Sequence, residues 1–99
     1  MNEIKTITIL LLSIQRALLG EITPNIRGIT CDLYDSQIII RCYFEGQVTK
    51  DNKESIDSVE AEVIADFPKF AIDLQCLMVN KPESLEQYKL SAWVYMRKE

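Results

Sequence analysis

Residues 29 to 45 alternate apolar and polar side chains on either side of a short turn at Asp35-Ser36. An alternation of period two places successive side chains on opposite faces of an extended strand. Two such runs joined by a turn are typical of a β-hairpin. The apolar positions of this hairpin are Ile29, Cys31, Leu33, Ile38, Ile40, Cys42 and Phe44. Because these side chains share one face, that face needs a second layer of structure to cover it.

A helical segment from residue 51 to 67 can supply part of that layer. Its apolar side chains recur at the spacing of one helix face, and they are Ile56, Val59, Val63 and Phe67. Asp51 followed three residues later by Glu54 resembles a capping box, with Asp in place of the usual Ser or Thr. Pro68 predicts the end of the helix, because the residue before a proline disfavours the helical conformation.

The remaining elements complete a recognisable order. Residues 3 to 19 have the periodicity of an amphipathic helix, and the runs 72 to 78 and 90 to 97 have the composition of strands. Residues 80 to 89 are expected to form a loop. The sequence therefore predicts one domain over residues 1–99 with an α+β fold. Its order is α-β-β-α-β-β, in which an antiparallel four-stranded sheet carries both helices on one face.

The content of histidine and cysteine limits the chemistry that this chain can perform. There is no histidine, so Ser-His and Cys-His nucleophile pairs and the usual zinc sites are excluded. The cysteines are Cys31, Cys42 and Cys76, and no C-x-x-C motif occurs. All three fall on the apolar side of their strands, so we expect buried, unreactive thiols. We expect neither an enzyme nor a cofactor.

The acidity of the chain is concentrated in one segment. The formal net charge is −4, and residues 51 to 66 hold six acids and a single lysine. The remainder of the sequence therefore carries a small positive excess. An acidic chain of this kind is unsuited to a bare phosphate backbone, so we do not expect a nucleic-acid partner.

Two readings of this acidic segment are open, a solvated helix face and a surface for a basic protein partner. Glu62 and Asp66 lie four residues apart, but hard cations want about six oxygens, so no metal site is expected. On the partner reading, the candidate contacts are Asp51, Glu54, Asp57, Glu62 and Asp66.

The face of the sheet opposite the cysteines offers a second candidate surface. By strict alternation it would carry Tyr34, Tyr43, Trp93, Tyr95, Arg41 and Arg97. These residue types are enriched at protein–protein hot spots, and they also stack on single-stranded RNA. Tyr43 and Tyr95 are the candidate anchors for a protein partner. The alternative is that a second layer, or a homodimer interface, covers the aromatic side chains.

The hydrophobic segment near the start of the chain is too short to cross a bilayer. The run from Ile7 to Leu12 is interrupted by threonine and flanked by Ser13 and Gln15, whereas a membrane span needs about 20 apolar residues. It also lacks the features of a signal peptide, since Glu3 offsets Lys5 and no small-residue cleavage site follows. The sequence predicts a cytoplasmic protein with no membrane partner.

Four segments resemble a known family. They read A-L-L-G-E-I-T-P-N-I-R-G-I-T (17 to 30), Y-F-E-G (43 to 46), E-V-I-A-D-F-P (62 to 68) and V-Y-M-R-K-E (94 to 99). They are similar to the small bacterial immunity proteins of contact-dependent growth inhibition and related polymorphic toxin systems. The resemblance implies a cytoplasmic protein that binds and neutralises the toxin domain of its own system, often a nuclease with a basic cleft. The competing functions are a homo-oligomeric structural protein and an RNA-binding module that uses the aromatic sheet face.

Overall fold

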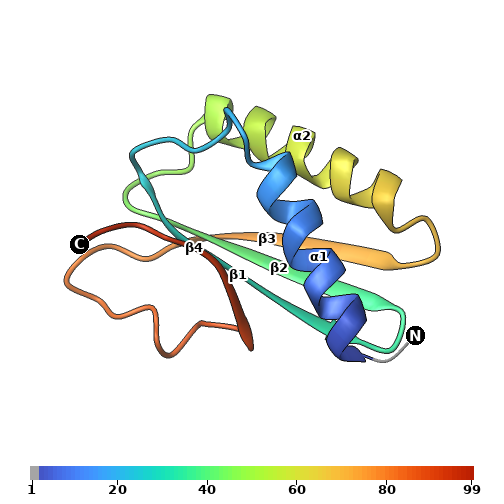
Figure 1. Cartoon of the computed structure of the whole chain (residues 1–99). Helices are drawn as coiled ribbons and strands as arrows, with labels where there is room; N and C mark the ends of the chain where they lie inside the picture. The colour runs from blue at the N-terminus through green and yellow to red at the C-terminus, as the bar shows by residue number, and fades with distance from the viewer. Residues whose placement is uncertain (1–2) are drawn as a thin grey trace.

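The computed structural model describes residues 3–99 and contains the expected order of elements (Figure 1). The helices are α1 (Glu3–Ala17) and α2 (Lys50–Asp66), and the strands are β1 (Ile26–Tyr34), β2 (Gln37–Phe44), β3 (Ala71–Met78) and β4 (Ala92–Met96). Beyond α1 the chain turns at Gly20, whose φ of 80° suits a residue without a side chain. The α+β class and the β1–β2 hairpin are confirmed.

The sheet is mixed, so the expectation of a fully antiparallel sheet is wrong. The strand order is β3-β2-β1-β4, and β1 pairs antiparallel with both of its neighbours. β3 instead runs parallel to β2, from Gln37 beside Ala71 to Phe44 beside Met78. The reason is the length of α2, which returns the chain to the start of β2 and makes β2-α2-β3 a crossover unit. A short connection would have favoured the antiparallel pairing.

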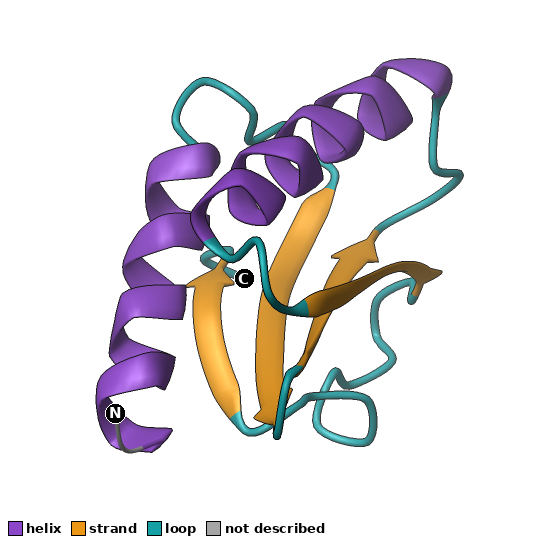
Figure 2. Ribbon diagram, turned by 90° about the vertical axis from the view of Figure 1, so that its right-hand side faces the viewer, coloured by secondary structure: helices purple, strands orange, loops and turns teal. Residues whose placement is uncertain are grey.

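Both helices cover one face of the sheet, as expected (Figure 2). The main core lies between these two layers, with Leu10 and Ile14 of α1 and Val59 and Val63 of α2 all buried. The sheet contributes the buried side chains of Ile26, Ile29, Cys31, Ile38, Ile40, Cys42 and Phe44. The alternation of β1 and β2 therefore predicted the inner face of the sheet correctly.

The opposite face of the sheet is covered by the chain's own 79–91 segment, which Figure 1 shows in orange to red, away from the helices. A second core forms there from Tyr43, Val79 and Leu85. Arg41 Nη1 and the Tyr43 hydroxyl donate to the carbonyl oxygen of Tyr88, at 2.7 and 2.9 Å. Because this segment lies over Tyr43, the expectation of an exposed aromatic face is wrong there, whereas Tyr34 is 57% exposed, as expected. The covering layer is the alternative that the structure supports.

A register shift in β4 separates two aromatic residues that strict alternation would place together. Thr30 of β1 pairs with Trp93, but the adjacent Ile29 pairs with Tyr95, so β4 carries one extra residue between them. Such a bulge turns the following side chain to the other face. Trp93 packs in the second core and Tyr95 packs against the main core. The outward placement of Tyr95 is therefore wrong.

The cysteines divide into two groups. Cys31 and Cys42 are buried as expected, and burial raises the pKa of the Cys31 thiol to about 12. Cys76 is exposed, so the expectation of burial is wrong for this residue. It faces the helix side of the sheet beside Cys42, but β3 is the outermost strand and α2 covers it only in part.

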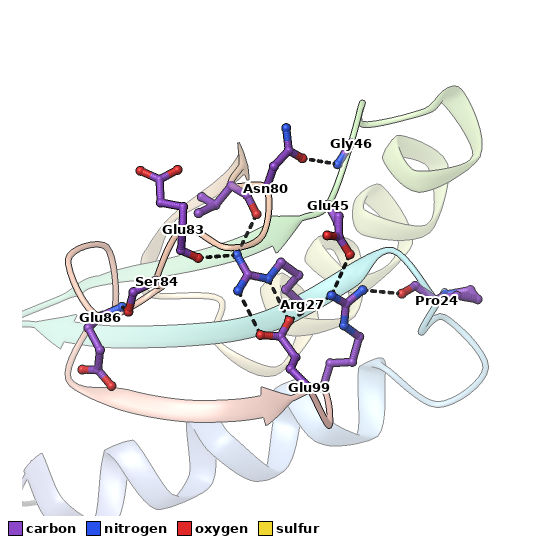
Figure 3. A network of polar contacts seen from close by, with 11 residues as sticks. Pro24, Arg27, Glu45, Gly46, Asn80, Glu83, Ser84, Glu86 and Glu99 are labelled. Atoms are coloured by element: carbon purple, nitrogen blue, oxygen red, sulfur yellow. Dashed lines mark hydrogen bonds and ion pairs between the residues drawn. The ribbon is translucent and has the colours of Figure 1, made fainter.

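Arg27 ties the 79–91 segment to the sheet (Figure 3). This residue of β1 is 4% exposed. Its Nη1 atom donates to the carbonyl oxygens of Val79 and Glu83, both at 2.8 Å. Its Nε and Nη2 atoms donate to the carboxylate of Glu99. The guanidinium thus joins three parts of the chain that are distant in sequence.

Candidate functional site

The candidate acidic surface lies on α2, and the first turn of this helix is fixed by Thr49 and Asn52. The Thr49 side chain accepts from the Asn52 N–H at 3.1 Å, and the Asn52 side chain accepts from the Thr49 N–H at 3.0 Å. This reciprocal pair is a capping box. The expectation that Asp51 and Glu54 form the box is wrong by two residues. Those two carboxylates are exposed instead and are free of a capping role.

Asn52 also anchors the start of α2 to the segment before β1. Its side chain is buried, donates to Thr23 Oγ1 at 3.1 Å and accepts from Asn25 Nδ2 at 2.8 Å. Asn25 and Arg27 belong to the 17–30 segment that resembles the immunity proteins, within its L-G-x-x-x-P-N-x-R motif (residues 19 to 27). Both side chains of this motif make internal contacts, so the motif holds the fold together.

The end of α2 is fixed by Asp66, which joins the two helices. Its Oδ2 atom accepts from Ser13 Oγ at 2.7 Å and from Arg16 Nη2 at 2.6 Å, both on α1. The Ser13 hydroxyl and the Arg16 guanidinium hold the pKa of this carboxyl below its ordinary value. Phe67 caps the helix with a buried side chain, and Pro68 follows, as expected. Asp66 therefore already serves the fold and is only in part available to a partner.

The other candidate carboxylates are exposed: Asp51, Glu54, Asp57 and Glu62. None of the four has an ion-pair partner among the residues that the structure describes. Asp51, Glu54 and Asp57 follow one another at intervals of three residues. Each is therefore offset around the helix from the one before, and the three are spread across the solvent side of α2. Glu62 lies beside Arg16 of α1 in a shallow pocket, whereas Asp57 lies on the flank nearest β3.

The two aromatic candidates do not lie on this surface. Tyr43 is completely buried beneath the 79–91 segment, and its hydroxyl lies 2.6 Å from Thr30 Oγ1. Tyr95 is half-buried on the helix side of β4. Neither side chain stands on an open outer face as the alternation predicted, because the 79–91 segment covers Tyr43 and the bulge in β4 turns Tyr95 to the helix side. The acidic candidates therefore share helix α2, and the two tyrosines lie outside that surface.

The arrangement offers charge and shape rather than reactive groups. Among the described residues, no three His, Cys, Asp or Glu side chains come together in a way that could hold a metal ion. The four exposed carboxylates of α2 can attract a cationic surface, and a helix fixed at both ends presents them in a constant geometry.

The comparison with protein families decides the identity. Residues 7–99 match the model of the MafI2 immunity protein family. The chain belongs to this family. A MafI2 immunity protein is an inhibitor of a toxin, so the expectations of an immunity protein and of a non-enzyme are confirmed. A search of curated proteins finds no match.

Membership in the MafI2 family establishes that the partner is a toxin protein. Asn25, Arg27 and Asp66 lie within the matched range, and the side chains of all three make contacts inside the protein. No helix among residues 3–99 is long and apolar enough to cross a bilayer.

Proposed function

We propose that this immunity protein neutralises its toxin by placing the outer surface of α2 against a basic region of the toxin domain. The toxin is a nuclease, and the complex forms in the cytoplasm. The observation that carries the proposal is a set of exposed carboxylates, Asp51, Glu54, Asp57 and Glu62, on a helix fixed at both ends. They have no ion-pair partner among residues 3–99.

Charge supplies the physical reason for the partner. A nuclease binds phosphate with Lys and Arg side chains, so its cleft is attractive to carboxylates that take the place of phosphate. Complementary charges of this kind speed the encounter more than they strengthen the final complex. An immunity protein must bind before the toxin acts, so a fast association rate is useful.

Rigidity supplies the second reason. Thr49 and Asn52 fix the start of α2, and the contact of Asp66 with Ser13 and Arg16 fixes its end. A surface that is already ordered loses little conformational entropy on binding. Asp66 contributes mainly by holding this geometry, and its exposed carboxylate edge adds to the negative field.

The first test is coexpression with the tagged toxin domain encoded by the adjacent gene. We expect a stable complex with one copy of each chain and loss of toxicity in cells that produce both proteins. An active toxin that never binds this chain, at any protein concentration tested, would contradict the proposed function.

A second experiment tests whether the surface of α2 is the part of this protein that binds the toxin. The double variant Glu54→Lys/Glu62→Lys should lower the association rate by about tenfold at low ionic strength and weaken its dependence on salt. The control is Glu21→Lys/Glu86→Lys, which changes the net charge equally but lies outside α2. Equal effects of the two variants would show that total charge, rather than the surface of α2, controls binding.

A further inference from the structure

The two edges of the sheet differ in how well they are protected against pairing with another strand. β4 is short, and its register shifts between the pairs formed by Ile29 and Thr30. β3 has eight residues and pairs with β2 without any shift along its whole length. Short strands and bulges are common ways to prevent an edge from accepting a strand. β4 has both of these features, and β3 has neither.

The backbone of β3 offers regularly spaced hydrogen-bonding groups along its open side. The N–H groups of Ala71 and Val79 donate inward, to Ser36 and Phe44, at 2.9 Å each. Because a parallel ladder alternates with period two, the even-numbered residues turn their N–H and C=O groups outward. These residues are Ile72, Leu74, Cys76 and Met78. The strand order ends at β3, so among residues 3–99 no further strand pairs with these groups.

The side chains of β3 do not block the addition of another strand at this edge. Residues 71 to 78 contain no lysine and no proline, which are the residues that most often block an edge strand. Cys76 is exposed, and Met78 is 57% exposed. Their side chains leave an apolar strip on the helix side of the edge. An added strand could cover this strip.

Negative charges flank the same edge on both sides of the sheet. Burial and the carboxylates of Asp57 and Glu60 raise the pKa of the Cys76 thiol, while Lys53 acts in the opposite direction. These three side chains of α2 therefore lie near the middle of the edge. On the other face of the sheet, Asp73 is exposed and accepts from Gln75. Arg41 of β2 also lies on that face and donates to Gln75, so the excess of carboxylates is on the helix side of the edge, where Asp57 and Glu60 outnumber Lys53.

This charge distribution discriminates between two occupants of the edge. Pairing of β3 with β3 of a second copy would bring the two α2 helices, each with Asp57 and Glu60, towards each other. Like charges would then repel across the new contact. An extended segment with Lys or Arg side chains would meet the opposite charge instead. Charge complementarity therefore favours a basic strand from a different protein.

We propose that an extended, basic segment of the toxin adds to the sheet alongside β3, a proposal that rests on the proposed function. Main-chain hydrogen bonds to Ile72, Leu74, Cys76 and Met78 give this contact its affinity. Lysine or arginine side chains of the added strand, on the helix side, meet Asp57 and Glu60. The acidic surface of α2 and the β3 edge are then neighbouring parts of one interface.

Substitutions at Cys76 test the proposal, since its N–H group points outward and makes no bond to β2. Cys76→Pro removes this donor, and proline is tolerated in an edge strand when its nitrogen faces solvent. Cys76→Lys and Cys76→Glu form a matched pair that changes only the sign of a charge at the edge. We expect Cys76→Pro and Cys76→Lys to weaken binding to the purified toxin domain by about tenfold or more, and Cys76→Glu to retain it. The denaturation midpoint of each variant reports whether it is folded.

Hydrogen exchange on the unmodified protein provides a second measurement that needs no substitution. The amides of Ile72, Leu74, Cys76 and Met78 should exchange rapidly in the free protein and at least tenfold more slowly in the complex. A complex that leaves these amides unprotected, with all Cys76 variants binding normally, would overturn this proposal but not the proposed function. Absence of any complex would overturn both. Protection that grows with the concentration of the free protein, together with a doubled mass, would assign the edge to a second copy and overturn the proposal.

Discussion

Arg27 and Glu99 form a two-point ion pair between residues that are 72 positions apart in the sequence. Arg27 Nε lies 2.7 Å from Glu99 Oε2, and Arg27 Nη2 lies 2.9 Å from Glu99 Oε1. The Arg27 side chain is almost fully buried, whereas that of Glu99 is a quarter exposed. Parallel contacts between a guanidinium and a carboxylate are among the stronger polar contacts in proteins.

Because of this ion pair, the free energy of unfolding should depend on pH in the acidic range. The hydrogen bond from Arg27, together with one from Arg97, lowers the pKa of Glu99 to about 2, below the ordinary 4.5. A depressed carboxyl pKa stabilises the folded state above about pH 4.5, and this contribution is lost as the pH falls towards 2. Glu99→Gln should therefore lower the free energy of unfolding at pH 7 by about 1–2 kcal/mol, allowing for partial exposure. Urea denaturation at several pH values measures the difference, which should shrink on acidification. A difference independent of pH would contradict the assignment.

Gly28 should not tolerate even a methyl group, although its backbone conformation is ordinary. A Cβ atom at this position would lie 2.9 Å from Trp93 Cζ3 and 3.2 Å from Leu85 Cδ1. Gly28→Ala should cost about 1–3 kcal/mol of stability through overpacking. Because Trp93 is the single tryptophan, its fluorescence follows unfolding directly. In a Trp93→Leu background, followed by circular dichroism, the cost of Gly28→Ala should be smaller. An equal cost in both backgrounds would show that Trp93 is not the obstacle.

The capping box at Thr49 can be tested against the box expected at Asp51. Thr49→Ala removes the acceptor for the Asn52 N–H and should cost about 1 kcal/mol. Asp51→Ala should cost less, since this carboxylate is exposed and makes only a favourable interaction with the helix dipole. Thermal denaturation of the two variants under one set of conditions gives the comparison. A larger loss for Asp51→Ala would reverse the assignment.

Tyr43→Phe separates a structural role from a role in toxin binding. The change removes a buried hydroxyl that lies 2.6 Å from Thr30 Oγ1 and 2.9 Å from the carbonyl oxygen of Tyr88. Stability should fall by about 1–2 kcal/mol because Thr30 loses a buried partner. Affinity of the folded protein for the toxin should be unchanged. Weaker toxin binding at unchanged stability would indicate that Tyr43 becomes exposed in the complex.

Sequence periodicity was sufficient for the order of the elements and for the buried faces of α2 and of the hairpin strands. The repeat of Ile56, Val59 and Val63 determines which side of α2 is buried, and the alternation of β2 determines which side of that strand is buried. These are local properties, since the side-chain directions within a helix or strand follow from its own geometry. The apolar repeat, together with Pro68 as the predicted end of the helix, also placed the exposed carboxylates on one helix.

Contacts between distant segments decided the rest. Nothing near Arg27 in the sequence specifies Glu99 as its partner, and nothing near Tyr43 specifies the segment that buries it. The bulge that separates Trp93 from Tyr95 arises only when β4 pairs with β1, and the exposure of Cys76 follows from the position of β3 at the edge.

The sequence by itself therefore determined the order of elements, the inner face of the hairpin and the acidic character of α2. Only the tertiary structure decided the parallel pairing of β3 with β2, the covering of the aromatic residues and the open edge beside Asp57 and Glu60. The physical reason is that secondary structure and hydrophobic periodicity depend on neighbouring residues. Strand partners and loop positions instead depend on how the helices and the sheet bury their apolar surfaces together.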